Sequence, residues 1–179
     1  MCRSEAQAHA ARELVRKVLA DLGLELHREK TRVVELNEGR EGFDFLGCHF
    51  HARMSGRLLE RGIRRYYLQR WPSQEAMKSI REKIKVKTGR GRAGMDIREV
   101  IAELNPILRG WGNYFRTGNA AIRFNQIDWY VVTRLRGLMV KRHGRNLRPG
   151  QSALWSRAWF EAHGLYRLRG TIRYPAPAS

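Results

Sequence analysis

The sequence has few acidic residues, few cysteines and no long apolar run, and each shortage excludes a class of protein. Its two cysteines, Cys2 and Cys48, form neither a CxxC pair nor a zinc-ligand spacing, so we expect reduced thiols and a cytoplasmic protein. No apolar run approaches the roughly 20 residues that cross a bilayer, and the N-terminus has no signal-peptide pattern. We therefore expect no membrane partner.

The shortage of acids leaves a strong and uneven positive charge. The chain has 35 Lys and Arg against 17 Asp and Glu, a net charge of +18. Residues 1–50 carry eight basic and nine acidic side chains, whereas residues 51–179 carry the other 27 and eight. A basic region of this kind binds nucleic acid, because phosphates release counterions when cations replace them. The alternatives are a solvated basic surface and contact with an anionic membrane.

Two amphipathic helices are predicted between Asp96 and Arg145, and the rest of the chain is arranged around them. Apolar residues recur there every three or four positions, which predicts one buried face on each helix: Ile97, Val100, Ile101, Leu104, Ile107, Leu108, Trp111, Phe115, Phe124, Ile127, Val131, Leu135 and Leu138. Asp96 is a candidate N-cap and Gly144 a candidate C-terminal stop. Pro106 is expected to kink the first helix or to split it at 104–105.

The flanking segments predict shorter elements. Ser4 can cap a helix over residues 4–23, and Ser73, at a boundary over Trp71–Ser73, can cap a further helix predicted over 74–86. Strands are predicted over 24–27, 31–36, 43–50 and 63–68, with a hairpin turn at Ser55–Gly56. A possible helix within 152–161 precedes a strand-like basic arm over 164–175. The fold class is thus α+β: a small hairpin-and-helix unit, a three-helix bundle and a basic C-terminal tail.

Several segments resemble one family, the group II intron-encoded reverse transcriptase/maturase. "LGLELHREKTRVVEL" followed by "GFDFLGCHF" is similar to the last two blocks of its polymerase palm. "REVIAELNPILRGWGNYFR" with "FNQIDWYVVTRLRGLMVKRHGR" resembles its maturase-specific domain, which also serves as the polymerase thumb, and "GLYRLRGTIRYP" resembles the ending of bacterial members. The resemblance runs from Cys2 to Pro175. It implies the C-terminal part of a palm over 1–70, a thumb/maturase-specific domain over 71–145 and a basic tail over 146–179.

The sequence departs from this family at the catalytic aspartates. The family has a Tyr/Phe-Ala-Asp-Asp motif upstream of the resembled region, whereas the aspartates here stand singly: Asp21, Asp44, Asp96 and Asp128. Two-metal nucleotidyl transfer needs carboxylates that hold two ions about 4 Å apart. We therefore expect no polymerisation by this chain alone, no cofactor of its own, and Mg²⁺ only in a complete polymerase. Members with a nuclease carry further Cys/His ligands after the thumb; none is found here, so no nuclease is expected.

The resemblance assigns roles in the palm segment by position. Lys30 matches the lysine proposed to protonate the leaving pyrophosphate as a general acid; the alternative is a solvated turn lysine. Phe45, Leu46 and Gly47 match the primer-grip hairpin, although Phe45 could equally pack in the core. Arg64 and Arg65, followed by Tyr66, lie where the hairpin would return toward nucleic acid, and neighbouring strand side chains cannot all face one way.

The helical segment supplies the remaining candidates for nucleic-acid binding: Arg81, Lys85, Arg109, Asn113, Tyr114, Arg116, Arg134, Lys141 and Arg142. Their guanidinium, ammonium and amide groups suit phosphate and sugar contacts, while the alternative is simple solubility. Trp111 and Tyr114 could pack in the core or stack on bases, and the apolar stripe favours the core for Trp111. His49 and His51 share a strand face as two metal ligands would, but no third ligand is in sight, so no metal site is expected.

Three functions remain as hypotheses. The first is an RNA-binding maturase fragment that grips intron RNA by backbone and shape to assist splicing, and that would hold a template–primer duplex in a complete enzyme. The second is half of a split reverse transcriptase whose missing N-terminal half is another chain. The third is a non-enzymatic basic DNA-binding module.

Overall fold

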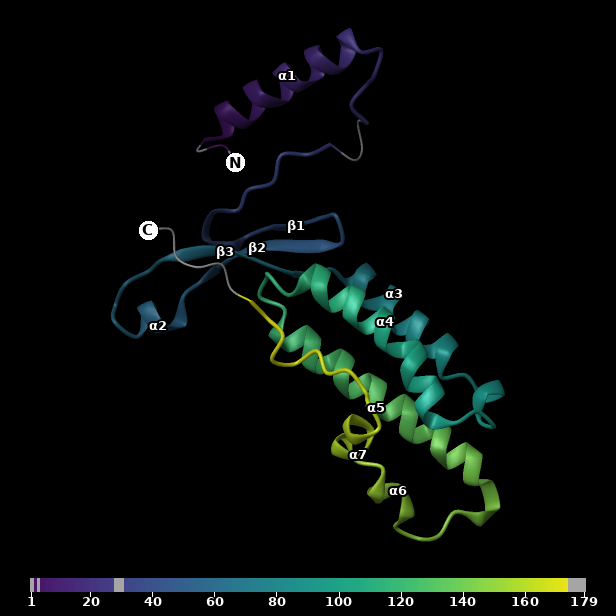
Figure 1. Ribbon diagram of the computed structural model, residues 1–179. Helices are drawn as coiled ribbons and strands as arrows, with labels where there is room; N and C mark the ends of the chain where they lie inside the picture. The colour runs from purple at the N-terminus through teal and green to yellow at the C-terminus, as the bar shows by residue number, and fades with distance from the viewer. Residues whose placement is uncertain (1, 3, 28–30, 174–179) are drawn as a thin grey trace.

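The computed structural model has an α+β fold and describes residues 2, 4–27 and 31–173. A first helix, α1 (Glu5–Asp21), is followed by a three-stranded antiparallel sheet of β1 (Gly42–Phe45), β2 (Cys48–Met54) and β3 (Tyr66–Pro72). The long helices α3 (Gln74–Lys87), α4 (Ile97–Phe115) and α5 (Ala121–His143) come next. The short helices are η1 (Asn37–Gly39), α2 (Gly56–Leu59), η2 (Arg90–Arg92), η3 (Gly144–Asn146), α6 (Gln151–Leu154) and α7 (Arg157–Ala162). Figure 1 shows the sheet between α1 and the long helices, so the predicted fold class is confirmed.

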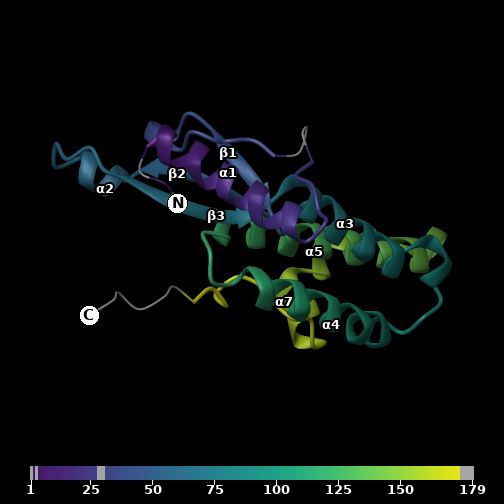
Figure 2. The same cartoon turned by 90° about the horizontal axis from the view of Figure 1, so that it is seen from above.

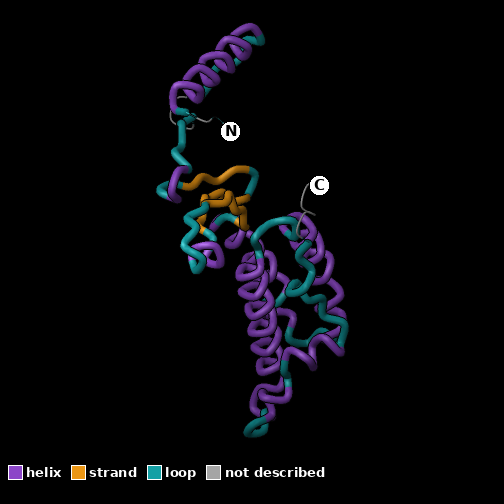
Figure 3. The backbone as a smooth tube through the Cα atoms, turned by 90° about the vertical axis from the view of Figure 1, so that its left-hand side faces the viewer, coloured by secondary structure: helices purple, strands orange, loops and turns teal. Residues whose placement is uncertain are grey.

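Helix α1 begins and ends as the sequence predicts but packs against little. The Ser4 side chain accepts a hydrogen bond from the Gln7 amide at 3.3 Å, and Gly23 has a positive φ of 69°. None of the residues of α1, all of which are described, is buried. Its apolar face, which includes Leu14, Val15 and Val18, is exposed, and Figure 3 shows the helix standing apart from the sheet and the bundle.

The predicted strand over 43–50 is in fact a hairpin. Leu46 and Gly47 have φ values of 48° and 72°, and two successive positive φ angles form a tight turn between paired strands. The register pairs Phe45 with Cys48, so Leu46 and Gly47 form the turn and the two strands pair without a bulge. The chain reverses after Met54, where a hairpin turn is predicted at Ser55–Gly56, but the connection contains α2 instead of a tight turn. The Ser55 side chain accepts from the Leu58 amide at 3.4 Å and caps α2. The returning strand therefore begins at Tyr66 rather than at residue 63.

The predicted strands over 24–27 and 31–36 are wrong. Their described residues are irregular, and the sheet among the described residues consists of β1, β2 and β3 alone. Alternation of apolar and polar residues indicates a strand only when another strand lies alongside to accept its backbone hydrogen bonds. Lys30 lies outside the described residues.

The three long helices form the core that their periodicity predicts. The fully buried side chains include Ile84 of α3, Leu104 of α4 and Leu135 of α5. The predicted caps are present: the Ser73 side chain accepts from the Ala76 amide at 3.2 Å, and Asp96 accepts from the Arg98 amide at 2.7 Å.

The prediction for the end of α5 at Gly144 is confirmed, whereas the predicted split of α4 near Pro106 is not found. Gly144 follows α5 with a φ of 52°. Pro106 lies inside a continuous α4, so the predicted split at 104–105 is wrong. The buried side chains of Leu104 and Leu108 on either side of the proline hold both halves of the helix against the core, which offsets the one missing backbone hydrogen bond.

The segment after α5 joins the same core instead of forming the predicted strand-like arm. No strand occurs in its described part, residues 164–173. Trp155, Phe160, Leu165 and Leu168 are buried with the long helices. Leu168 packs so closely on α4 that a Cβ at Gly112 would lie 2.6 Å from its Cδ2 atom. The possible helix within 152–161 is realised as two short helices, α6 and α7.

The sheet is fixed to the bundle at one end. The Asn119 amide donates to the Arg70 carbonyl at 2.7 Å, and the Arg70 guanidinium donates to the Thr117 hydroxyl. The Ser73 amide donates to the Gly47 carbonyl at 2.8 Å. These contacts set the position of the hairpin turn relative to α4. Among the described helices, none is long and apolar enough to cross a membrane.

Candidate nucleic-acid interface

The β1–β2 turn lies on the surface beside α4. Phe45 is 59% exposed and Leu46 is 68% exposed, so Phe45 does not pack in the core. The Tyr114 hydroxyl donates to the Leu46 carbonyl at 2.8 Å, while the tyrosine itself remains 57% exposed. Tyr114 is therefore a surface residue that holds the turn against α4.

Trp111 packs against the core, as the apolar stripe favours. Its ring centroid lies 4.9 Å from that of Phe115 and 5.4 Å from that of Phe124. Its indole N–H is buried and has no hydrogen-bond partner within the described part of the chain. Trp111, Tyr114 and Lys83 also line a groove of about 480 Å³ between α3 and α4.

The predicted binding residues of the helical part come from α3, α4 and α5, with Arg116 directly after α4. We call these nine residues the basic helical surface: Arg81, Lys85, Arg109, Asn113, Tyr114, Arg116, Arg134, Lys141 and Arg142. Arg109, Asn113 and Arg116 are spaced so that they share one face of α4. The Arg109 guanidinium also lies 5.1 Å from the centre of the Tyr166 ring. Lys141 and Arg142 lie near the other end of the bundle, because α4 and α5 are antiparallel neighbours joined by a short connection.

The cations of this surface are largely free of carboxylates. In the described residues, Lys85 alone among them has an acidic oxygen within 4.0 Å, at 3.6 Å from Glu82. An unpaired guanidinium or ammonium keeps its full charge available for a phosphate. The basic helical surface therefore has the electrostatics that a polyanion requires.

Two acids of the helical part, Glu103 and Asp128, serve internal contacts instead. Glu103 accepts from the Lys87 ammonium at 2.6 Å and from the Arg92 guanidinium at 2.8 Å. Hydrogen bonds from Arg92 and then from Lys87 lower the pKa of the Glu103 carboxyl to about 2. This pair of contacts ties η2 and the end of α3 to α4.

Asp128 is buried and anchors the segment after α7. Its two carboxylate oxygens accept from the Leu168 amide at 3.0 Å and the Arg169 amide at 2.9 Å, with the Arg157 guanidinium 3.6 Å away. Burial raises the pKa of this carboxyl and outweighs these hydrogen bonds, which act in the opposite direction. The carboxylates of Glu103 and Asp128 are thus both engaged in contacts that hold the bundle together.

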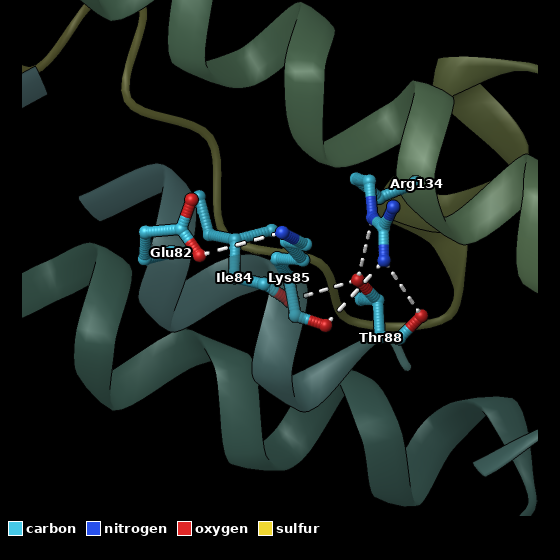
Figure 4. Close-up of polar contacts among 5 residues, drawn as sticks. All are labelled: Glu82, Ile84, Lys85, Thr88 and Arg134. Carbon is cyan, nitrogen blue, oxygen red and sulfur yellow. Dashed lines mark hydrogen bonds and ion pairs between the residues drawn. The ribbon is translucent and has the colours of Figure 1, made fainter. Parts of the chain in front are cut away.

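Arg134 and Arg142 also donate hydrogen bonds within the protein, and Figure 4 shows those of Arg134. The Arg134 guanidinium donates from α5 to the Thr88 hydroxyl at 3.0 Å, to the Thr88 carbonyl at 3.2 Å and to the Lys85 carbonyl at 3.4 Å. It thereby caps the C-terminal end of α3, where unpaired carbonyls gather. Arg142 donates to the Met95 carbonyl at 3.1 Å. A phosphate contact by either residue stays a prediction.

The remaining predicted residues lie elsewhere. Arg64 and Arg65 are exposed in the loop before β3, and the Arg65 guanidinium lies 5.5 Å from the centre of the Tyr67 ring. Figure 2 shows that this end of the sheet, next to α2, points away from the long helices. The structure therefore does not bring these two arginines together with the basic helical surface.

The two histidines of the shared strand face have separate partners. His49 Nδ1 lies 2.6 Å from an Asp44 carboxylate oxygen, and His51 Nδ1 lies 2.9 Å from the Ala52 carbonyl. Within the part of the chain that the structure describes, no three His, Cys, Asp or Glu side chains gather as metal ligands would.

Sequence reasoning missed Trp129. This α5 residue is 65% exposed and lies off the apolar stripe of the helix. It lines a groove of about 410 Å³ with Arg81, Asn125, Gln126 and Tyr130. A tryptophan at a position outside the apolar stripe could have indicated an exposed aromatic side chain, but the periodicity considered only the stripe residues.

Comparison with known families identifies the helical part. Residues 77–157 match the family model described as the group II intron, maturase-specific domain. The match begins within α3 and runs through α4, α5 and α6, so it covers the elements that carry the basic helical surface. No curated protein matches the chain. Residues 77–157 thus form a group II intron maturase-specific domain, which has a role in intron splicing.

Proposed function

We propose that this chain binds folded intron RNA through the basic helical surface and thereby assists splicing. The observation that carries the proposal is the separation of charges. Apart from Lys85, which lies 3.6 Å from Glu82, the cations of this surface have no carboxylate within 4.0 Å among the described residues, whereas Glu103 and Asp128 are engaged inside the bundle. Structured RNA is recognised mainly through phosphates, 2′-hydroxyls and shape, which a distributed set of cations suits. The RNA performs the splicing chemistry, and the protein stabilises its folded form.

The surface is long enough to contact several phosphates. Helix α5 has 23 residues, which corresponds to about 34 Å at 1.5 Å per residue. Cations at both ends of the bundle can therefore bind well-separated points of one RNA. In a complete polymerase, the same surface would hold the template–primer duplex, with the Phe45–Gly47 turn at the primer end.

A salt titration of intron RNA binding tests the proposal. If phosphates dominate, the logarithm of the association constant falls linearly with the logarithm of salt concentration, with a slope of roughly −0.7 to −0.9 per phosphate contacted. We expect a slope of several units. A slope near zero would rule the phosphate-dominated mode out. Competition by duplex DNA separates this function from a DNA-binding module, because such a module would lose intron RNA to the DNA.

We propose as a second candidate that the chain is completed by a separate polymerase half. The apolar face of α1, with Leu14, Val15 and Val18 exposed, favours this candidate because large aliphatic side chains gathered on one surface mark a contact site. Co-expression with a reverse-transcriptase half that carries the aspartate pair should then restore primer extension. Co-expression that fails to restore primer extension would count against this candidate.

A further inference from the structure

We propose that the groove between α3 and α5 is a site for one unpaired RNA nucleotide, whose base stacks on the Trp129 indole and whose phosphate pairs with the Arg81 guanidinium. This inference rests on the proposed RNA binding. It adds a contact that depends on the base to a surface otherwise suited to the sugar–phosphate backbone.

The position of Trp129 is the first argument. The buried face of α5 is complete without it, because Phe124, Ile127, Val131 and Leu135 are each at most 1% exposed. Trp129 stands on the polar side of the helix with 65% of its surface in solvent. A single exposed apolar residue means little, but an indole beside cations offers a flat face that any base can stack on.

The neighbours of Trp129 are the second argument. Arg81 reaches the groove from α3, and no carboxylate lies within 4.0 Å of it in the described chain. Lys78 and Lys85 stand three and four residues from Arg81, on the same side of α3. The groove therefore places an aromatic face next to a positive charge, which are the two elements that bind a single-stranded nucleotide.

The amides of the groove can read the edge of a base. Asn125 is exposed at its rim. The Gln126 amide oxygen accepts from the Arg123 guanidinium at 3.3 Å, which leaves its NH₂ group free to donate. A base stacked on Trp129 thus has both a donor and an acceptor at hand.

A protein segment is the competing occupant of this groove. An apolar protein surface laid over Trp129 would also cover Arg81 and the two amides, and each buried polar group left without a partner is costly. A nucleotide satisfies all of them, because its phosphate, its base face and its base edge match the three kinds of group present. The chemistry of the groove therefore favours RNA over protein.

The test measures binding of the full chain to a uridylate octamer and to an abasic sugar–phosphate octamer of the same length. We expect Trp129→Ala to weaken binding of the uridylate octamer about tenfold, with an unchanged salt slope, and Trp129→Phe to stay within about threefold of wild type. On the abasic octamer, Trp129→Ala should bind as wild type does. Arg81→Gln should instead reduce the salt slope by about 0.7 on both probes.

Ile122→Ala is the matched control, because Ile122 is an equally exposed apolar residue of α5 outside the groove. It should bind both octamers as wild type does. The proposal is overturned if Trp129→Ala binds the uridylate octamer normally, if it loses the same factor on the abasic probe, or if wild type does not bind the uridylate octamer. The first two outcomes leave intron RNA binding by wild type intact, so they are distinguishable from a failure of the proposed function.

Discussion

At the scale of single residues, the scarce acids decide how the bundle responds to pH. The pKa of Glu103 is lowered to about 2 from an ordinary value of 4.5 by hydrogen bonds from Arg92 and Lys87. A carboxyl whose pKa is lower in the folded state stabilises the fold above its unfolded pKa. Asp128 acts oppositely, because burial raises its pKa above the ordinary value of 3.8. Its contribution to the stability of the fold is therefore present below about 3.8 and is lost as the pH rises toward the pKa of the folded state.

We predict that Glu103→Gln lowers the melting temperature at pH 6 and that this difference from wild type disappears by about pH 2. The stability that Glu103 contributes is present above about 4.5 and is lost as the carboxylate is protonated between 4.5 and 2. Thermal unfolding followed by circular dichroism at both pH values checks this. Glu41→Gln is the control, since Glu41 is exposed and should change the melting temperature little at either pH. A difference that persists unchanged at pH 2 would show that the lost contacts do not depend on charge.

Sequence reasoning at this scale identified caps well and contacts poorly. Ser4, Ser73 and Asp96 were recognisable as N-caps because the residue type and its position before an apolar stripe suffice. The role of Arg134 was not recognisable, since its acceptors lie 46 and 49 residues away along the chain. Nothing in a local pattern distinguishes an arginine that caps another helix from one that waits for a phosphate.

At the scale of secondary-structure elements, helices were predictable and short strands were not. Each long helix buries an apolar stripe that extends over several turns, so its sequence shows the three- to four-residue spacing many times and predicts the helix reliably. The segments 24–27 and 31–36 offered only two or three alternations each. Whether so short a segment becomes a strand depends on a partner that the local sequence does not contain.

Two variants can distinguish a cation that stabilises the contact between α3 and α5 from a cation that binds RNA. We predict that Arg134→Gln destabilises the fold by about 1–3 kcal/mol, because the Thr88 carbonyl at the end of α3 belongs to a residue that is 3% exposed and would lose its donor. Lys141→Gln should leave stability unchanged and reduce the salt slope of RNA binding by about one unit. Urea denaturation and the salt titration measure the two effects. Equal stability of the two variants would mean that the contacts of Arg134 do not hold α3.

The β1–β2 turn provides a second test at this scale. Gly47 has a φ of +72°, so we predict that Gly47→Ala destabilises the fold by about 1–2 kcal/mol, since a Cβ disfavours that backbone conformation. Gly110→Ala is the matched comparison: it lies inside α4, and a Cβ there would meet no described atom within 4 Å apart from those of its chain neighbours and its own helix backbone. It should stabilise by about 0.5–1 kcal/mol, because alanine favours a helix interior more than glycine does. Urea denaturation of both variants measures the two signs, and a stable Gly47→Ala protein would contradict the turn geometry.

At the scale of the whole molecule, burial divides the chain unevenly. The bundle, together with Trp155, Phe160 and Leu168, contains nearly all the buried apolar side chains, whereas the first 40 residues contribute none among those described. The charge divides at nearly the same place, since residues 1–50 are close to neutral and the remainder is strongly basic. The sequence predicted this division of charge, but it could not show that the final segment completes the core, because isolated leucines in a basic stretch have no period.

This uneven burial predicts uneven protection of backbone amides in hydrogen exchange. Helix α1 has 17 residues and no buried side chain, and an isolated helix of that length is only marginally stable in water. Its amides should therefore exchange far faster than those of α4 and α5, whose opening requires the core to separate. Exchange followed by mass spectrometry on peptides from α1 and α4 of the same sample compares the two directly. Equal protection would mean that α1 is covered in solution, by a second copy if protection rises with protein concentration, since the exposed face of Leu14, Val15 and Val18 is then buried between chains.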